Sequence, residues 1–175
     1  ASRRKIPIGS FSVSHTKKFF IFYNKKQKNM NRVKQLVHAE KVYRMGFTGK
    51  NVRIALLDTG AYGHPDIRSN VIYFKDYVNH KQEFYDDNGH GTHILGIMCG
   101  NGSASDGRVM GIAPKAEVMV FKILDKEGNG KTSDALKALD WILKNHKRYN
   151  LKLLNFSMGY VPHANQVKQK QLLDK

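Results

Sequence analysis

The chain has 175 residues and a formal net charge of +16, enough length for one domain with a hydrophobic core. No run approaches the roughly 18 apolar residues of a membrane-spanning helix, so we expect no membrane insertion. The single cysteine, Cys99, excludes an internal disulfide and is compatible with a reducing compartment.

The positive charge is concentrated at the amino-terminal end. Residues 1–50 hold 13 Lys/Arg against one acidic residue, whereas residues 51–175 hold 17 against 13. We interpret residues 1–30 as a basic leader or the remnant of a pro-segment. Such a leader can bind nucleic acid or an anionic surface. No nucleic-acid-binding module accompanies it, however, and we expect no nucleic acid among the partners.

The first predicted elements are a short strand and a helix. The strand is indicated weakly, at Phe19–Tyr23. Residues 31–45 have helical spacing that ends at Gly46. The residues that carry this spacing are Val33, Leu36, Val37 and Glu40-Lys41.

A nearly continuous apolar run, Val52–Leu57, predicts a strand that is covered on both faces of a parallel sheet. It places Asp58 at the carboxyl end of the strand, where ligands and chemistry gather in open α/β sheets. Position alone explains Asp58 equally well as an active-site carboxylate or as the cap of the following turn. A second strand is predicted at Val71–Tyr77.

The segment His90–Met98 predicts a helix with small residues inserted in it. In such a helix His90 lies in the first turn, and His93 lies on the same face. Gly91 and Gly96 each cost about 1 kcal/mol of helix stability relative to alanine. This cost indicates that a backbone or a ligand passes close to them. Taken alone, His90 is explained at least as well as a solvated loop histidine.

Further along, the pattern alternates strand, helix and strand. Strands are predicted at Ala116–Leu124 and Leu151–Phe156, with a tight loop at Asp125–Lys131. The helix between them is capped by Thr132 or Ser133. We expect its buried face to hold three positions: Leu136, Leu139 and Ile142 or Leu143. This order forms a parallel crossover, so the predicted fold class is α/β, a parallel sheet flanked by helices.

Three kinds of chemistry use residues of this type. A zinc site would combine His90 and His93 with an aspartate, but zinc-protease helices space the histidines i, i+4 around a glutamate. A phosphate-binding loop would use Gly100–Gly102 or Gly128–Gly130, yet neither is followed by a third glycine or by Gly-Lys-Ser/Thr. In acyl transfer, Asp58 would hold His90 in the required tautomer, and His90 would take the proton from a serine.

Four strings of residues stand in a recognisable order: Asp58-Thr59-Gly60 with His64–Ile67, then Asp87–Gly96, Gly111–Pro114 and Leu154–Gly159. Together they resemble the subtilisin-like serine proteases (subtilases), over a match that extends from about Val33 to Gly159. The residue string Tyr85–His90 looks most like that of a bacterial alkaline branch of the family whose members act inside the cell. The resemblance implies a three-layer α/β/α fold over residues 31–175 and a cytoplasmic location, with secretion as the alternative.

The resemblance also implies a role for each matching residue. Asp58 is the orienting acid, His90 the general base, and His93 a structural neighbour. The walls of a substrate cleft are Lys122–Leu124 with Gly128, Asn129 and Gly130, and opposite them Ser157, Met158 and Gly159. An extended peptide lies between the walls as an added strand. A peptide or protein substrate is therefore the expected partner, and the oligomeric state stays open.

Two strings of the family do not occur in this sequence. The nucleophile belongs to a Gly-Thr-Ser-Met-Ala-x-Pro string and the oxyanion-hole asparagine to an Ala-Ala-Gly-Asn string, and none of the nine serines has that setting. We therefore expect the amino-terminal part of a longer protease, with a sheet incomplete on its carboxyl-terminal side and no activity alone. The alternative is a non-catalytic module with a degenerate protease fold, which binds peptides or uses its basic tail.

Calcium is the one cofactor left open. It is common in the family, and Asp106 and Asn101 are candidate ligands, although an ordinary surface turn explains their loop better. No other metal site is expected.

Overall fold

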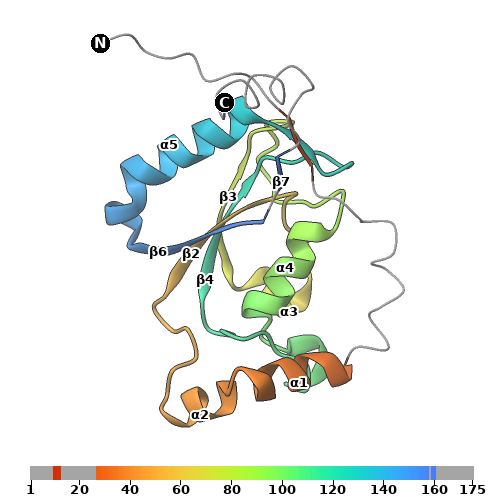
Figure 1. The fold of residues 1–175 in the computed structure, drawn as a ribbon, viewed down its shortest axis with the longest axis vertical. Coiled ribbons are helices and arrows are strands. Elements are labelled where there is room, and N and C mark those ends of the chain that lie inside the picture. Colours follow the sequence, from red (N-terminus) through yellow and green to blue (C-terminus); the bar gives the residue numbers. More distant parts are fainter. Residues whose placement is uncertain (1–9, 13–26, 158, 161–175) are drawn as a thin grey trace, which may run out of the picture.

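A four-stranded parallel sheet forms the centre of the computed structural model, which describes residues 10–12, 27–157 and 159–160 (Figure 1). The strand order is β3–β4–β2–β6. The strands of this sheet are β2 (Arg53–Asp58), β3 (Val71–Asp76), β4 (Glu117–Lys122) and β6 (Leu151–Phe156). A smaller antiparallel sheet consists of β5 (Asn129–Lys131), β1 (Ser10–Ser12) and β7 (Gly159–Tyr160), with β1 in the middle.

Helices cover both faces of the parallel sheet (Figure 1). α5 (Thr132–Tyr149) covers one face, and α3 (Pro65–Arg68) and α4 (His90–Cys99) cover the other. The remaining helical segments are α1 (Gln27–Leu36), α2 (Ala39–Arg44) and the 3₁₀ turn η2 (Ser103–Ser105). Successive strand residues point to opposite faces. In β2, Ala55 and Leu57 therefore pack toward α5, whereas Ile54 and Leu56 pack toward α3 and α4. The predicted three-layer α/β/α fold is confirmed.

The same alternation determines which strand ends face α4. Asp58 continues the face of Ile54 and Leu56, and it pairs in register with Lys122 of β4. Lys122 in turn pairs with Asp76 of β3. The carboxyl edge of the sheet therefore carries a row of buried charged side chains that point toward the helix beginning with His90.

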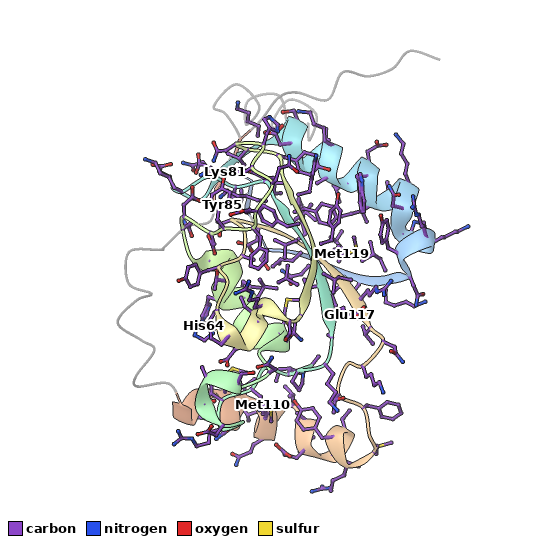
Figure 2. All side chains as sticks on the ribbon, turned by 180° about the vertical axis from the view of Figure 1, so that it is seen from behind. His64, Lys81, Tyr85, Met110, Glu117 and Met119 are labelled. Atoms are coloured by element: carbon purple, nitrogen blue, oxygen red, sulfur yellow. The ribbon has the colours of Figure 1, made fainter. Side chains whose placement is uncertain are left out.

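The side chains seen from behind distinguish the two ends of β4 (Figure 2). Glu117 lies at its amino end, where it accepts a 2.6 Å hydrogen bond from the Nε of Arg53. Met119 is fully buried in the centre of the sheet, and Tyr85 lies near the carboxyl end with Lys81 over its ring. The fully buried polar side chains of these strands lie at the carboxyl end, whereas the Arg53–Glu117 pair at the amino end is partly exposed.

The single helix predicted over residues 31–45 is wrong. The structure has two helices, because His38 adopts a left-handed conformation (φ 54°) between α1 and α2. In α1 and the residue after it, Leu36 and Val37 are open to solvent, whereas Lys34 is buried. The hydroxyl of Tyr43 donates a 2.6 Å hydrogen bond to the carbonyl of Ile112, which sets how α2 lies on the body of the protein.

Helix α5 buries only part of the predicted face, because Leu139 and Ile142 pack against the core and Leu136 and Leu143 do not. Its buried positions are Asp134, Ala135, Ala138 and Ile142, whereas Leu136 is exposed and Leu143 is 71% exposed. The small alanines let the helix approach the sheet closely, while Trp141 stacks on Tyr73 at 4.9 Å and packs against Phe121. The predicted cap is also wrong, because the N-cap residue is Lys131, which makes no side-chain capping bond.

Two predictions concern segments outside the described residues, the short strand at Phe19–Tyr23 and the cleft residue Met158. In the part of the chain that the structure describes, no helix is both long and apolar enough to span a membrane.

Candidate active site

Asp58 and His90 are brought together at the carboxyl edge of the sheet. The Oδ1 of Asp58 lies 2.7 Å from the Nδ1 of His90. The Asp58 side chain is fully buried, and the His90 ring is 18% exposed. A carboxylate can only accept a hydrogen bond, so the proton of the neutral imidazole lies on Nδ1 and the Nε2 lone pair is left available. This is the arrangement of an acid that orients a base.

Gly91 makes this approach of α4 to β2 geometrically feasible. A Cβ at Gly91 would collide with the carbonyl oxygen of Gly60 and would lie 3.2 Å from the Oδ1 of Asp58. The sequence interpretation of Gly91 as a point of close approach is therefore correct. At Gly96, an added Cβ would meet no heavy atom within 4 Å in the described part of the chain, so packing does not explain that glycine.

Asp86 organises the loop that leads into α4. Its carboxylate accepts hydrogen bonds from the backbone N–H groups of Asn88, Gly89 and Thr92 and from the hydroxyl groups of Thr59 and Thr92. Burial alone would raise the pKa of Asp86, but these hydrogen bonds outweigh it and lower the pKa. Thr59 also accepts a 2.9 Å bond from the Gly91 N–H. The end of β2 is thereby fixed to the first turn of α4.

The pKa of His90 is raised above its ordinary value. The hydrogen bond to Asp58 is the largest cause, burial opposes it, and the negative charges of Asp58 and Asp86 add to the rise. The Oδ1 of Asp58 additionally accepts a 2.7 Å bond from the Thr59 N–H. Among the described residues, the Oδ2 of Asp58 is the only buried side-chain nitrogen or oxygen without a hydrogen-bond partner.

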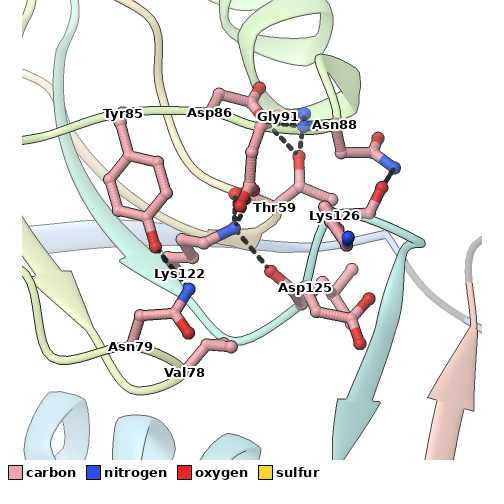
Figure 3. A network of polar contacts seen from close by, with 12 residues as sticks. Thr59, Val78, Asn79, Tyr85, Asp86, Asn88, Gly91, Lys122, Asp125 and Lys126 are labelled. Carbon is pink, nitrogen blue, oxygen red and sulfur yellow. Dashed lines mark hydrogen bonds and ion pairs between the residues drawn. The ribbon is translucent and has the colours of Figure 1, made fainter.

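Lys122 is a site residue whose side-chain position the sequence analysis missed. Its ammonium is fully buried and donates to the carbonyl oxygens of Thr59 (2.6 Å) and Leu124 (2.8 Å) and to the Oδ1 of Asp87 (2.7 Å) (Figure 3). A lysine inside an apolar run that is expected to be covered on both faces was the available signal. Such a charge must find partners at the strand end.

Asp76 continues this polar row on β3. It accepts hydrogen bonds from the backbone N–H groups of Val78, Asn79 and Lys81 and from the hydroxyl of Tyr85. Burial would raise the pKa of Asp76, but these bonds lower it. The pKa of Tyr85 is raised to about 12, chiefly by burial, so its hydroxyl stays protonated and can donate.

The predicted cleft residues that the structure describes lie on β5 and β7 or directly before these strands. Asn129 and Gly130 belong to β5, and Gly128 has a φ of 80° in the turn that precedes it. A Cβ at Gly130 would lie 2.5 Å from the carbonyl oxygen of Ile123, so only glycine lets β5 pass the end of β4 this closely. On the other side Ser157 precedes β7, and its hydroxyl accepts a 2.8 Å bond from the side chain of Asn155.

Between these two strands lies β1, a segment of the chain itself. Phe11 pairs with Gly130 on one side and with Tyr160 on the other, and both pairings are antiparallel. A pocket of about 230 Å³ adjoins β5 and is lined in part by Val78, Asn129 and Gly130. The position between β5 and β7 thus accommodates an extended strand.

One of the two suspected calcium ligands, Asn101, makes other contacts. The Oδ1 of Asn101 accepts hydrogen bonds from Ser103, and its amide donates to Ser69. Their loop is tied to α3, because the Oδ1 of Asp66 accepts a 2.7 Å bond from the Ala104 N–H. Within the described ranges, no group of three His, Cys, Asp or Glu side chains has the arrangement of a metal site.

Comparison with known proteins gives a consistent picture. Serine protease AprX of Bacillus subtilis (strain 168) is 44% identical over 109 residues, which make up 61% of this chain and 25% of that protein. Minor extracellular protease Epr of the same organism is 34% identical over 124 residues, 70% of this chain and 18% of Epr. Subtilisin Savinase of Lederbergia lenta is 33% identical over 123 residues, 70% of this chain and 43% of Savinase.

The chain therefore spans less than half the length of each of these relatives. The sequence profile described as "Subtilase family" matches residues 49–175, most of the chain and the whole of the Asp58–His90 site. By this match and by its motifs, the chain belongs to the subtilase family.

Proposed function

We propose that this chain is the amino-terminal part of a subtilisin-type serine endopeptidase, with Asp58 as the orienting acid and His90 as the general base. The observation that carries the proposal is the 2.7 Å contact between Asp58 Oδ1 and His90 Nδ1. The raised pKa of His90 is consistent with it, because a base that accepts a serine proton must bind that proton firmly.

The chemistry follows from the free Nε2 of His90. As a serine Oγ attacks the carbonyl carbon of the scissile peptide, Nε2 takes the hydroxyl proton, and the carbonyl becomes an oxyanion. The imidazolium is stabilised by Asp58 and then gives the proton to the leaving amine, which leaves an acyl-enzyme ester. Water hydrolyses the ester by the same proton transfers. The serine and the oxyanion-hole asparagine belong to strings that these 175 residues do not contain.

We further propose that an extended peptide substrate lies between β5 and β7. The strands Asn129–Lys131 and Gly159–Tyr160 already hold one extended segment, β1, through main-chain pairing on both of its sides. Main-chain pairing of this kind gives affinity without demanding a particular side chain. Ser157, Gly128, Asn129, Gly130 and Gly159 keep their proposed role as cleft residues.

Residues 1–30 have a proposed role of their own. Since β1 belongs to this segment and occupies the strand position between the cleft walls, it supports the interpretation as a pro-segment remnant over that as a nucleic-acid-binding tail. A cytoplasmic location stays a prediction from the sequence of the Tyr85–His90 string. Secretion stays the alternative, and one relative, Epr, has the word extracellular in its name.

The direct test is to complete the chain. The coding sequence beyond Lys175, or the carboxyl-terminal half of a relative fused there, is expected to supply a Gly-Thr-Ser-Met-Ala string and peptide hydrolysis. Labelling by a phosphonate reagent specific for active-site serines is expected in the completed protein and not in the 175-residue chain. If the completed protein binds peptides without turnover, the non-catalytic module is the better account.

A further inference from the structure

Lys122 carries a buried charge that the proposed reaction does not use directly. Its side chain is completely inaccessible to solvent, and its three N–H donors have three acceptors: the carbonyls of Thr59 and Leu124 and the carboxylate of Asp87. The ammonium also lies 5.0 Å from the centre of the Tyr85 ring. Every donor of the ammonium is therefore satisfied within the protein (Figure 3).

The acceptors belong to the segments that position the catalytic pair. Thr59 follows Asp58, and its N–H donates to the Asp58 carboxylate. Asp87 lies in the loop before His90, where the next residue, Asn88, accepts a 3.1 Å bond from the His90 N–H. Leu124 bridges to Gly130 of the proposed cleft wall. The Lys122 side chain thus joins three segments: the turn after Asp58, the loop before His90 and the start of the cleft wall at Leu124.

Stability alone is a weak reason for such an arrangement. Replacing a buried ion pair with apolar groups of similar volume is often neutral or stabilising, because the charges lose hydration when they are buried. An apolar side chain on β4 would also continue the hydrophobic face of Val118 and Val120. The three polar partners of Lys122 therefore favour a different reason for the lysine: it fixes the arrangement of the segments that it contacts, rather than adding to folding stability.

We propose that Lys122, through Thr59 and Asp87, is a positioning residue that holds Asp58 and His90 in hydrogen-bonding contact. This inference rests on the proposed function for its meaning, since the contact it maintains is the proposed acid–base pair. It concerns side chains that the 175-residue chain already contains, and it can therefore be tested without a nucleophile or turnover.

The test follows His90 by NMR in the 175-residue chain, with Leu153→Lys as the common background so that the exposed edge strand β6 does not drive self-association. Two quantities are measured: the pKa of the ring and the exchange rate of the low-field Nδ1 proton. In Lys122→Met the side chain stays unbranched, is one heavy atom shorter and loses its donors. We expect the pKa of His90 to fall and the Nδ1 proton to exchange about tenfold faster, the effect of one weakened charge-assisted hydrogen bond.

The direction of the pKa change separates positioning from simple charge effects. The charged groups that face His90 are Asp58 and Asp86. Removing the Lys122 cation by itself raises the pKa of a histidine, because one repulsive charge is lost. A fall therefore reports a weaker contact with Asp58. A rise or no change, with slow Nδ1 exchange retained, would overturn the proposal and leave Lys122 a structural residue.

A second pair of variants covers the case in which Lys122→Met does not fold. Asp87 is 35% exposed and tolerates substitution better. Asp87→Ala and Asp87→Asn remove the same charge, but only asparagine keeps an oxygen acceptor for Lys122. We expect faster Nδ1 exchange in Asp87→Ala and near wild-type exchange in Asp87→Asn. Equal behaviour of the two variants would contradict the proposal.

A surface pair on α5 is the matched control. Lys144 and Asp140 form a 2.6 Å ion pair that is largely exposed. Lys144→Met and Asp140→Ala are expected to leave both His90 signals unchanged.

If the wild-type chain itself has no low-field Nδ1 proton, the proposed acid–base pair fails, and the role of Lys122 fails with it. If the completed protein is inactive but Lys122→Met has the expected effect, only the proposed function fails.

Discussion

At the scale of single residues, the site depends on how closely the start of α4 approaches the end of β2. Asp58 and His90 are 32 positions apart in the chain, and their contact of 2.7 Å exists because Gly91 leaves room for the Gly60 carbonyl. Asp86 and Thr59 then fix the two backbones to each other. The contact between acid and base is therefore a property of the surrounding backbone as much as of the two side chains.

Gly91→Ala is expected to break this approach. The new Cβ collides with Gly60, and overpacking of this kind costs about 1–3 kcal/mol of folding free energy. Gly96→Ala is the control in the same helix: its Cβ meets nothing within 4 Å, so helix propensity predicts a gain of about 1 kcal/mol. Urea unfolding of both variants measures the difference. Equal effects of the two alanines would contradict the packing assigned to Gly91.

His90 gives stability a defined pH dependence. Its pKa is raised in the folded protein, so its contribution is fully present below the ordinary pKa of histidine, about 6.5, and is lost as the pH rises through the folded value. His90→Gln is therefore expected to destabilise the protein more at pH 5.5 than at pH 9, by on the order of 1 kcal/mol. His80→Asn, at an exposed loop position, controls for histidine loss in general. A larger effect of His90→Gln at pH 9 would refute the assignment.

The sequence singles out Asp58 and His90 as candidates, because each stands in a distinctive string at the end or the start of a periodic segment, and the structure places their side chains in contact. The sequence was not sufficient for Lys122, Asp76 or Asp86, whose partners come from other segments. The ammonium of Lys122 meets Thr59 and Asp87 only after β2, β4 and the loop before α4 are assembled. Such tertiary hydrogen bonds leave no periodic signal in the sequence.

At the scale of elements, α5 shows where hydrophobic spacing misleads. Leucine is more apolar than alanine, so the spacing predicts that Leu136 and Leu143 face the core. In the structure Leu139 and Ile142 of the predicted face do pack against the core, but Ala135 and Ala138 are buried in place of Leu136 and Leu143, with Trp141, Tyr73 and Phe121 packed beside them. By contrast, β2, β4 and β6 lie within one or two residues of their predicted bounds, because each lies in a mainly apolar run. β2 and β4 are buried on both faces, as their runs indicate, whereas most of β6 is exposed.

Two substitutions in α5 test this orientation. Ala138 is fully buried, so Ala138→Leu is expected to cost about 1–3 kcal/mol through overpacking. Leu143→Ala removes a side chain that is mostly in solvent and should change stability by less than about 0.5 kcal/mol. Thermal or urea unfolding of the two variants distinguishes the faces. The predicted leucine face would give the opposite ranking.

At the scale of the whole molecule, the edge strand β6 is the part of the parallel sheet most open to association with another chain. In the described part of the chain, β6 pairs on one side only, with β2, and its Leu153, Leu154 and Phe156 are exposed. An unpaired apolar edge strand is a template for association with another chain. We expect the 175-residue chain to self-associate and Leu153→Lys to reduce this. Sedimentation at several concentrations measures it, and a monodisperse wild-type monomer at high concentration would contradict it.

The measurement that tests the central claim most directly is the kcat/KM of the completed protein with and without His90. In subtilisin itself, loss of the triad histidine costs on the order of 10⁶ in kcat, and that known magnitude sets the scale here. We expect a loss of that order in His90→Ala and a far smaller one in His93→Ala, which carries the same substitution one helical turn away. Equal activity of the His90→Ala variant and the unsubstituted protein would show that His90 is not the general base.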